Sequence, residues 1–253
     1  MPVTIKSARE IELMAEAGRI LEIVHNELRD ALHAGMSTLD IDRLGEEIIR
    51  SYDCIPSFLN YNGYPASICV SLNQEVVHGI PDKHRLIQDG DIVSLDAGVI
   101  YKGYHSDAAR TYGVGEISKE AKNLMQITKE CFFEGIKYAR EGNHLFDISG
   151  AIGRYAEERG YGVVRDLCGH GIGTALHEAP EIPNYEVGRK GVKLRPGMTL
   201  AIEPMINAVG EDVKVLPDGW TVLTKSGSLS AHFEHSVAIT SEGPVILTMP
   251  TIV

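Results

Sequence analysis

The chain has 253 residues, 43% of them apolar, so it is long enough to bury a substantial core. Its formal net charge is -11, and lysine and arginine form no cluster, which argues against nucleic acid or an anionic membrane as the main partner. The N-terminus lacks the apolar stretch of a secretory signal, and no run reaches the roughly 18 apolar residues of a membrane span. With four widely separated cysteines, we expect a soluble cytoplasmic protein.

Helices and strands are predicted to alternate along the chain. A capping box over 7–10 precedes apolar residues at helical spacing and indicates a long first helix, and a second helix should begin after Thr38 or Asp40. The further predicted elements are, in order, a strand over 67–77, strands over 92–100 and 104–112, helices over 121–140 and 148–159, and strands over 163–168, 199–207, 220–224 and 231–239. Nothing in the sequence marks a boundary between independent domains.

Two pairs of segments recur at one offset of 107 residues. Each segment opens with a glycine and reaches an acid five positions later in the first pair and six positions later in the second. The pairs are Gly35 to Asp40 with Gly142 to Asp147, and Gly90 to Asp96 with Gly197 to Glu203. Two matches at the same offset make coincidence the weaker explanation. We therefore expect a single domain of two pseudo-symmetric halves, about residues 1–115 and 116–253, whose equivalent strands meet across a pseudo-twofold axis.

Asp96 and Asp107 give the strongest local signal for chemistry. They lie on the strands expected over 92–100 and 104–112, and a hairpin centred between Tyr101 and Lys102 would place them opposite one another. Facing residues have Cβ atoms about 5 Å apart, where two bare carboxylates repel. A shared proton or a bridging divalent cation would hold them there, and two solvated strand acids are the simpler structural alternative.

Three residues of the second half favour the cation. Glu203 and Glu234 lie within apolar strand segments, where an unpaired charge costs several kcal/mol. His170 stands between glycines, which let a ligand approach closely. Four carboxylates around one divalent ion would leave about two charges uncompensated, whereas two ions neutralise them. Oxygen ligands with one imidazole and no thiolate suit manganese, iron(II) or cobalt, with zinc as a further candidate.

The order of these residues resembles a known family. The acids and histidine are joined by two flanking segments, Val77-His78-Gly-Ile-Pro81 and Leu176-His177-Glu-Ala-Pro180. Together they are similar to the metal-dependent type I methionine aminopeptidases, and the similarity extends over essentially the whole chain, with the compact bacterial members as the best match. The resemblance implies an α+β architecture, the pita-bread fold, in which a pseudo-twofold duplicated antiparallel sheet is backed by helices.

The resemblance also implies a mechanism and a ligand set. Two divalent ions would lower the pKa of a bridging water to supply hydroxide near neutral pH, so hydrolysis needs no nucleophilic side chain. Glu203 would in addition carry a proton between the attacking water and the leaving amine. His177 would hydrogen-bond the substrate carbonyl and the oxyanion, and His78 would contact the scissile amide. The implied metal ligands are Asp96, Asp107, His170, Glu203 and Glu234.

A pocket for methionine is the second implication of the resemblance. The positions that line it in the family are matched here by Phe58, Tyr61, Tyr64, Cys69 and Trp220. Such apolar and aromatic walls suit a flexible thioether side chain, although core packing is the simpler explanation for Phe58 and Tyr64. Phe58 stands where bacterial members often have cysteine, and Leu176 where they commonly have an aromatic residue. Both changes keep the wall apolar.

The sequence thus predicts a monomeric hydrolase that removes the initiator methionine from nascent polypeptides and prefers a small second residue. A contact with the ribosome surface is compatible with this function. Two alternatives share the fold: an X-Pro aminopeptidase or prolidase-like hydrolase, and a catalytically inactive peptide-binding module. His232 and His235 flank Glu234 and are candidates for orienting it. The remaining cysteines, Cys54, Cys131 and Cys168, are interpreted as small core residues.

Overall fold

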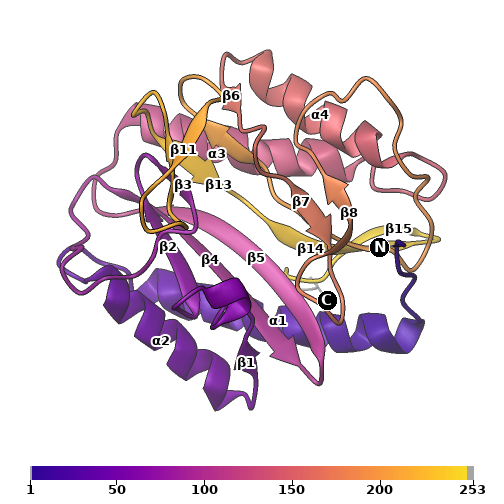
Figure 1. The fold of residues 1–253 in the computed structure, drawn as a ribbon, viewed down its shortest axis with the longest axis horizontal. Helices are drawn as coiled ribbons and strands as arrows, with labels where there is room; N and C mark the ends of the chain where they lie inside the picture. The colour runs from indigo at the N-terminus through magenta and orange to yellow at the C-terminus, as the bar shows by residue number, and fades with distance from the viewer. Residues whose placement is uncertain (1, 250–253) are drawn as a thin grey trace.

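The computed structural model describes residues 2–249. Two helices belong to the first half of the sequence, α1 (Ala8–Ala31) and α2 (Thr38–Ser51), and two to the second, α3 (Lys119–Ile136) and α4 (Leu145–Glu157). A short 3-10 helix, η1, spans Tyr61–Gly63. The two helix pairs lie at opposite ends of the view in Figure 1, with the strands between them. Within the described range, no helix is both long enough and apolar enough to cross a membrane.

The strands are antiparallel and form four sheets among the described residues. In the first half, β4 (Ile92–Tyr101) pairs with β1 (Ile55–Pro56), β2 (Ile68–Leu72) and β5 (Tyr104–Gly113). A five-stranded sheet has the order β15 (Gly243–Ile246), β14 (His235–Thr240), β9 (Thr199–Ile202), β7 (Gly169–Gly171) and β8 (Glu178–Ile182). The smaller sheets have the orders β13 (Ser230–His232), β10 (Met205–Asn207), β6 (Gly162–Val163), and β11 (Val213–Val215), β12 (Val222–Thr224), β3 (Glu75–Val77).

Each helix pair buries its apolar side against strands of its own half. Leu21 of α1 and Ile49 of α2 belong to the same buried cluster as Leu95 of β4. Phe132 of α3 lies in a second cluster with Leu200 of β9. At about 25 cal/mol per Å² of apolar surface removed from water, these two clusters supply the main stabilisation of the two layers. The helices thus leave the opposite face of the strands free to build a site.

The glycines of the repeated segments share one backbone conformation. Gly35 and Gly142 have φ angles of 91° and 90°, and Gly90 and Gly197 have 95° and 89°. Glycine enters this region without steric cost. Three residues after the first pair, α2 and α4 begin, and in both helices an aspartate in the first turn accepts a hydrogen bond from the N-cap backbone N–H. The repeat is therefore present in local geometry as well as in sequence.

Two of the predicted strands are divided at an acidic residue. The strand expected over 199–207 is interrupted at Glu203 between β9 and β10, and the one expected over 231–239 is interrupted at Glu234 between β13 and β14. Pro204 follows the first acid and has no backbone N–H to give to a ladder. Both interruptions fall at residues that the sequence singled out as metal ligands.

The other departures from the predicted elements are a division within one strand, shifted element ends, and five short strands that the sequence did not predict: β1, β7, β8, β11 and β15. The strand expected over 67–77 divides at Asn73, whose φ of 52° turns the chain, and the two parts join different sheets. The helix expected over 121–140 ends at Ile136, and the strand expected over 163–168 is confined to β6. Periodicity identifies the face that a segment buries, but contacts from elsewhere in the fold decide where the element stops.

Strand β5 joins the two halves. Glu234 donates its backbone N–H to the carbonyl of Ala109 at 2.8 Å, and Ala109 donates back at 3.4 Å. Two residues away, the backbone N–H of Asp107 donates to Oγ of Ser236 at 2.9 Å. The segment around Glu234 therefore lies beside β5, and residues distant in sequence share one face.

Candidate metal centre and substrate pocket

Asp96 and Asp107 lie on the same face of the β4–β5 hairpin, but they are not directly opposite. The register pairs Asp96 with Ala109 and Gly98 with Asp107. The two acids are therefore diagonal neighbours, which still keeps their side chains within reach of each other.

The difference comes from the turn. The hairpin is centred between Lys102 and Gly103, not between Tyr101 and Lys102 as the sequence suggested, and both turn residues have positive φ angles, 47° and 84°. A two-residue turn with positive φ at both positions matches the twist of the flanking strands. Lysine rarely adopts a positive φ, so the sequence did not predict the turn at Lys102 or the register of β4 with β5 that follows from it.

Three of the predicted ligands share one row across the strands. Asp96 is paired with Ala109, whose backbone is hydrogen-bonded to Glu234. The β9–β14 and β10–β13 ladders continue one another across an interruption. Their shared register places Glu203 opposite Glu234 within that interruption. Paired residues point to the same face of a sheet, so these three carboxyl groups project together.

The other two ligands come from the next row. Asp107 contacts Ser236, which pairs with Ala201, and Ala201 in turn pairs with His170. This row lies two residues along each strand from the first, so its side chains project from the same face. The fold thus brings all five predicted ligands together from both halves of the chain.

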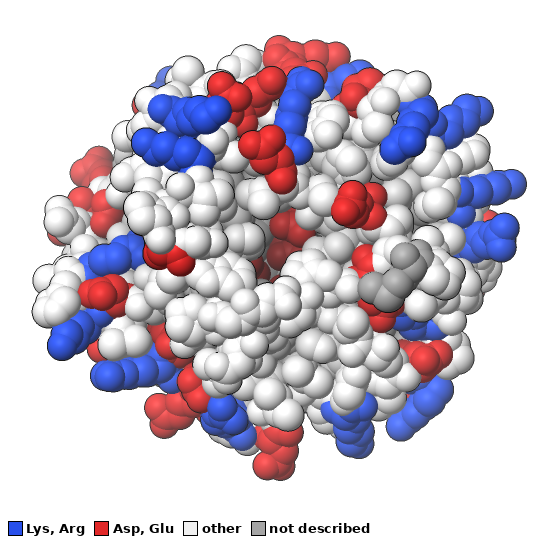
Figure 2. All heavy atoms as spheres, in the orientation of Figure 1, with Lys and Arg blue, Asp and Glu red and all other residues white. Residues whose placement is uncertain are grey.

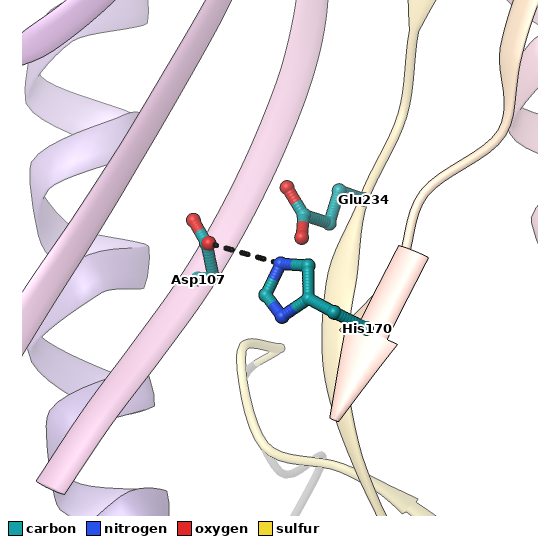
Figure 3. A group of neighbouring side chains, drawn as sticks. All are labelled: Asp107, His170 and Glu234. Carbon is teal, nitrogen blue, oxygen red and sulfur yellow. Dashed lines mark ion pairs between the residues drawn. The ribbon is translucent and has the colours of Figure 1, made fainter. Parts of the chain in front are cut away.

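Distances within the cluster are short. His170 Nε2 lies 3.8 Å from Asp107 Oδ2 and 3.6 Å from Glu203 Oε1. Figure 3 shows Asp107, His170 and Glu234 converging from three segments, and ligand atoms of these residues all lie within 4.8 Å of one another. Such spacing lets a single cation contact several of them at once.

The carboxylates have oxygens that need a partner. One side-chain oxygen each of Asp96, Asp107 and Glu234 is buried and accepts no hydrogen bond within the part of the chain that the structure describes. Glu234 is 2% exposed and Asp107 is 4% exposed. Buried polar atoms are normally paired because leaving them unpaired costs free energy. Divalent cations would satisfy these oxygens, so the donor set fits a metal centre.

Electrostatics lead to the same requirement. Burial raises the pKa of Asp96 to about 7 and the pKa of Glu203 to about 8. Burial and neighbouring carboxylates raise the pKa values of Asp107 and Glu234 well above their usual range. Burial lowers the pKa of His170 to about 3, so its imidazole is neutral and can act as a ligand. Cations would reverse the shifts of the acids, because positive charge favours the carboxylate form.

These side chains form the floor of a cavity of about 200 Å³. In Figure 2, acidic atoms lie at the bottom of a central hollow. The cavity is lined by every residue that the sequence assigned to substrate, namely Phe58, Tyr61, Tyr64, Cys69, His78, His177 and Trp220, together with Leu176. It is also lined by residues that the sequence did not single out for the site: Asn62, Val77, Leu167, Cys168 and Met205.

Aromatic rings make one wall of the cavity. The rings of Tyr64 and Trp220 meet edge to face with centroids 5.1 Å apart, and the ring of His78 lies 6.2 Å from Trp220 in a similar arrangement. The Tyr64 hydroxyl donates to the carbonyl of Gly79 at 3.0 Å. The polar end of Tyr64 is therefore satisfied away from the cavity, and the wall offers mainly apolar surface.

His177 is oriented by Tyr61. Its Nδ1 lies 2.7 Å from the Tyr61 hydroxyl, and its ring centroid is 4.2 Å from that of His170. A hydroxyl that donates to Nδ1 leaves the ring proton on Nε2. His177 can then donate a hydrogen bond from Nε2 to a substrate oxygen beside the metal ligands.

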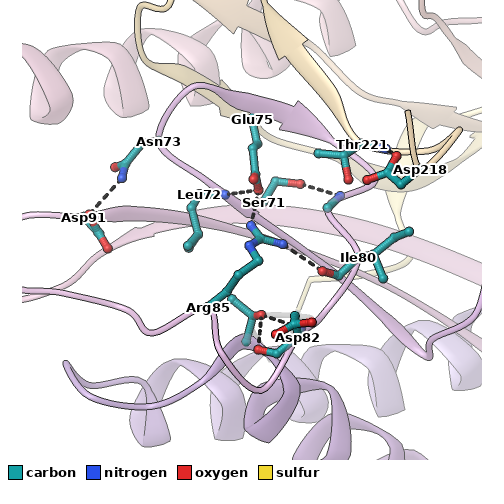
Figure 4. Close-up of polar contacts among 12 residues, drawn as sticks. Ser71, Leu72, Asn73, Glu75, Ile80, Asp82, Arg85, Asp91, Asp218 and Thr221 are labelled. Carbon is teal, nitrogen blue, oxygen red and sulfur yellow. Dashed lines mark hydrogen bonds and ion pairs between the residues drawn. The ribbon is translucent and has the colours of Figure 1, made fainter. Parts of the chain in front are cut away.

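His78 adopts an unusual backbone conformation, with a φ of 59°. The residues after it are fixed by several hydrogen bonds (Figure 4): the N–H of Gly79 donates to Ser71 Oγ at 3.1 Å, and Arg85 Nη1 donates to the Ile80 carbonyl at 2.7 Å. Strained conformations persist only where the surroundings determine them, and they concentrate at functional sites. Burial lowers the pKa of His78 to about 4, so this imidazole is neutral.

Glycine is required beside this histidine. A Cβ atom on Gly79 would lie 2.2 Å from the Val70 carbonyl oxygen. The two backbones are this close because the N–H of Val70 donates a hydrogen bond to the carbonyl of Gly79. Glu75 supports the loop from the other side by pairing with Arg85 and accepting from the Leu72 N–H. The loop that carries His78 is therefore held by packing, hydrogen bonds and an ion pair together.

The two histidines that flank Glu234 point in opposite directions. His235 Nδ1 lies 2.8 Å from Thr248 Oγ1, and its ring packs on Phe132 of α3, so it faces the helix layer. His232 Nε2 lies 3.4 Å from Glu203 Oε2. Of the two residues that the sequence considered for orienting Glu234, neither shows a hydrogen bond to it.

The cysteines separate into two groups. Cys54 and Cys131 are buried, as expected of small core residues. Cys168 is half-buried and lines the cavity, so its interpretation as a core residue was wrong. It directly precedes β7, the strand that carries His170, and both residues line the cavity.

Comparisons with known proteins agree with this geometry. The sequence profile of metallopeptidase family M24 matches residues 12–241. A methionine aminopeptidase of Clostridium acetobutylicum is 53% identical over 98% of this chain and 99% of its own length. The crystal structure of a methionine aminopeptidase from Thermotoga maritima superposes with a TM-score of 0.96 at 44% identity, covering 98% of this chain and 100% of that one.

A more distant relative shares the fold over part of its length. An Xaa-Pro dipeptidase from Bacillus anthracis superposes with a TM-score of 0.77 at 27% identity, and the match covers 98% of this chain but 62% of that one. The expected α+β pita-bread fold is therefore confirmed, and the relatives matched over their whole length are methionine aminopeptidases. The chain belongs to metallopeptidase family M24 and, within it, to the methionine aminopeptidases, which makes it a hydrolase.

Proposed function

We propose that this protein removes the initiator methionine from the N-termini of nascent polypeptides and prefers a small second residue. The observation that carries the proposal is the position of the acid and histidine cluster at the floor of a cavity with an aromatic, apolar wall. Such a cavity of about 200 Å³ suits one flexible thioether side chain, because sulfur packs favourably against ring edges. The floor would hold the reacting bond beside the ligands.

Two divalent ions would be held by Asp96, Asp107, His170, Glu203 and Glu234. When bound, they supply Lewis-acid activation of a water molecule and of the substrate carbonyl. The oxygen-rich donor set suits manganese, iron(II) or cobalt, with zinc as a further candidate. Three of these acids each have a buried oxygen that accepts no hydrogen bond from residues 2–249, which supports the assignment.

Three side chains would act on the substrate directly. Glu203 would accept a proton from the attacking water and deliver it to the leaving amine, since its carboxylate faces both the ligand cluster and the cavity. His177 would donate from Nε2 to the carbonyl oxygen as negative charge develops there. His78, fixed by its loop, would contact the scissile amide.

The same proposal covers the organisation of the chain. Because both halves supply ligands, residues 1–253 would act as one catalytic domain made of the halves 1–115 and 116–253. The active form would be a monomer in the cytoplasm, where nascent chains are the substrate and the ribosome surface is a compatible docking partner.

One assay tests the proposal against both alternatives. Metal-stripped protein would be restored with manganese or iron(II) and incubated with Met-Ala-Ser, Met-Leu-Ser and Ala-Pro-Ala. We expect fast cleavage of the first peptide, slow cleavage of the second and none of the third. Cleavage of the proline peptide alone would assign the protein to the X-Pro hydrolases. No turnover of any peptide after restoration would favour an inactive peptide-binding module.

A further inference from the structure

The carboxylate of Glu203 is approached by an imidazole at each oxygen. Oε1 lies 3.6 Å from His170 Nε2, and Oε2 lies 3.4 Å from His232 Nε2. His170 belongs to the ligand cluster, so Oε1 faces the metal side. The second imidazole has no role in the function proposed above.

His232 is placed by the strand that carries Glu234. It is the last residue of β13 and pairs with Met205, which lies two residues beyond Glu203. Alternation along a strand points His232 and Glu234 to the same face. The ring is therefore directed to the row of acids by the same register that builds the ligand cluster.

The ring of His232 is buried with its hydrogen-bonding capacity unused. It is 2% exposed, and neither ring nitrogen has a hydrogen-bond partner among residues 2–249. A buried imidazole without a partner loses the hydrogen bonds that it made to water. The carboxylate oxygen beside Nε2 is Oε2 of Glu203, and the tautomer with its proton on Nε2 makes that nitrogen a donor.

His232 does not contribute to the wall of the substrate cavity. Among the described residues, those that line the cavity include Glu203 and the other ligands but not His232. The imidazole can therefore support the carboxylate without occupying space in the cavity.

We propose that His232 is a positioning residue for Glu203: its Nε2–H donates to Oε2 and holds Oε1 toward His170 and the reacting groups. The torsion that rotates a glutamate carboxylate is soft, so a donor at one oxygen fixes which oxygen takes and returns the proton. The separation of 3.4 Å exceeds the usual N–H···O distance. Hydrogen bonds in unliganded sites are often long and tighten when substrate binds.

This inference rests on the proposed role of Glu203, and the test keeps the two apart. His232→Gln retains an amide N–H near the position of Nε2, whereas His232→Asn retains a polar group that stops short of Glu203. His232→Leu removes the donor at similar size. Manganese binding is measured by calorimetry, kcat and KM are measured on Met-Ala-Ser, and circular dichroism reports folding. Glu203→Gln is measured in parallel, and His235→Gln is the control on the helix-facing side.

We expect kcat to fall while KM and manganese binding stay nearly unchanged. His232→Asn and His232→Leu should lower kcat by about 10- to 100-fold, as loss of an outer-shell partner does, with KM and manganese binding changed by less than about threefold. His232→Gln should restore kcat to within about fivefold of the parent protein, and His235→Gln should leave kcat unchanged. If the leucine variant does not fold, the comparison of the two amides carries the test.

Three outcomes would overturn the proposal. An equal fall in kcat for His232→Gln and His232→Asn would show that the position of the donor does not matter. An unchanged kcat in all His232 variants would show that the contact with Glu203 does not contribute to catalysis. Loss of bound manganese in the His232 variants would indicate that His232 is a metal ligand. Its proximity to Glu203 and Glu234 is compatible with that role. A fully active Glu203→Gln protein would instead reject the proposed role of Glu203 itself.

Discussion

Glu203 and Glu234 lie opposite each other at the point where two antiparallel ladders are interrupted. The β9–β14 ladder ends one residue before this pair, and the β10–β13 ladder resumes two residues after it. The backbone groups released there are taken up elsewhere: Asn184 Nδ2 donates to the Glu203 carbonyl at 3.0 Å, and the Glu234 N–H donates to Ala109 at 2.8 Å. The interruption therefore frees two acids for the cluster without leaving these groups unpaired.

Asp107→Asn tests whether the cluster of acids binds metal. The change keeps the size of the side chain but removes its charge, so manganese affinity should fall by more than the 10- to 100-fold typical of outer-shell partners. Turnover should be lost with it. Calorimetry and peptide cleavage measure the two effects.

The matched control is Asp30→Asn, an acid on α1 whose side chain is 69% exposed. It should change neither quantity. If Asp107→Asn kept its manganese affinity, the cluster of acids would not be the metal site.

His177→Ala should separate chemistry from metal binding. The side chain lines the cavity and is held by Tyr61, but it is not part of the ligand group around His170. Loss of a donor to the oxyanion should lower kcat by about 100-fold, while bound metal, measured by mass spectrometry, stays unchanged. Equal loss of metal and activity would show that His177 has another role.

Tyr61→Phe extends this test. It removes the hydroxyl that fixes the His177 ring but leaves the ring itself, so the fall in kcat should be smaller than that of His177→Ala. A larger fall would mean that Tyr61 contacts the reacting groups directly.

The metal-free protein should lose stability as pH rises above neutrality. The pKa values of Asp96, about 7, and Glu203, about 8, are raised by burial, so the folded state binds more protons than the unfolded chain up to these pH values. The free energy of unfolding therefore falls as pH rises through both pKa values. Buried histidines act in the opposite sense below about pH 6.5, so the comparison should begin at pH 7.

The measurement is the Tm of chelated protein from pH 7 to pH 8.5, where we expect a decrease of a few degrees. Saturating manganese should abolish the dependence because it keeps the carboxylates charged in the folded state. Glu203→Gln should flatten the curve of the metal-free protein. A Tm that stays constant or rises in the parent protein would contradict the raised pKa values.

The sequence was sufficient for the fold and pointed to the acids of the cluster, whereas the pocket residues followed from the family resemblance, and Asn62, Leu167 and Met205 of the cavity were not singled out. Acids inside apolar strand segments, such as Asp96 and Glu203, indicate a buried charge that needs a partner. It was not sufficient for the hairpin register, because the turn at Lys102 depends on a positive φ that lysine does not signal.

Contacts between distant segments were also beyond the sequence. The hydrogen bond between Tyr61 and His177 joins residues 116 positions apart, and His232 lies beside Glu203, which is distant from it in sequence. Such partners follow from strand order and register, which local patterns do not encode. Cys168 was placed in the core for the same reason, since the glycine-rich sequence around His170 does not show that this segment borders the cavity.

Phe58→Ala tests the shape of the methionine pocket. Phe58 is buried and packs beside Gly98, where an added Cβ would meet its ring at 3.1 Å. Removing the ring enlarges the cavity, so kcat/KM for Met-Ala-Ser should fall while that for Phe-Ala-Ser rises, and the ratio should drop by about 10-fold or more. The control is Ile55→Ala, an exposed apolar residue on β1. An unchanged ratio would place Phe58 outside the specificity pocket.

The central claim is that a pair of cations occupies the space between the acids of the two halves. Anomalous diffraction at the manganese edge, from crystals grown with excess Mn²⁺, measures this directly. We expect two peaks about 3.5–4 Å apart, both within reach of Asp96, Asp107, His170, Glu203 and Glu234. A single peak bound through His232, or no peak within reach of these five side chains, would contradict the account.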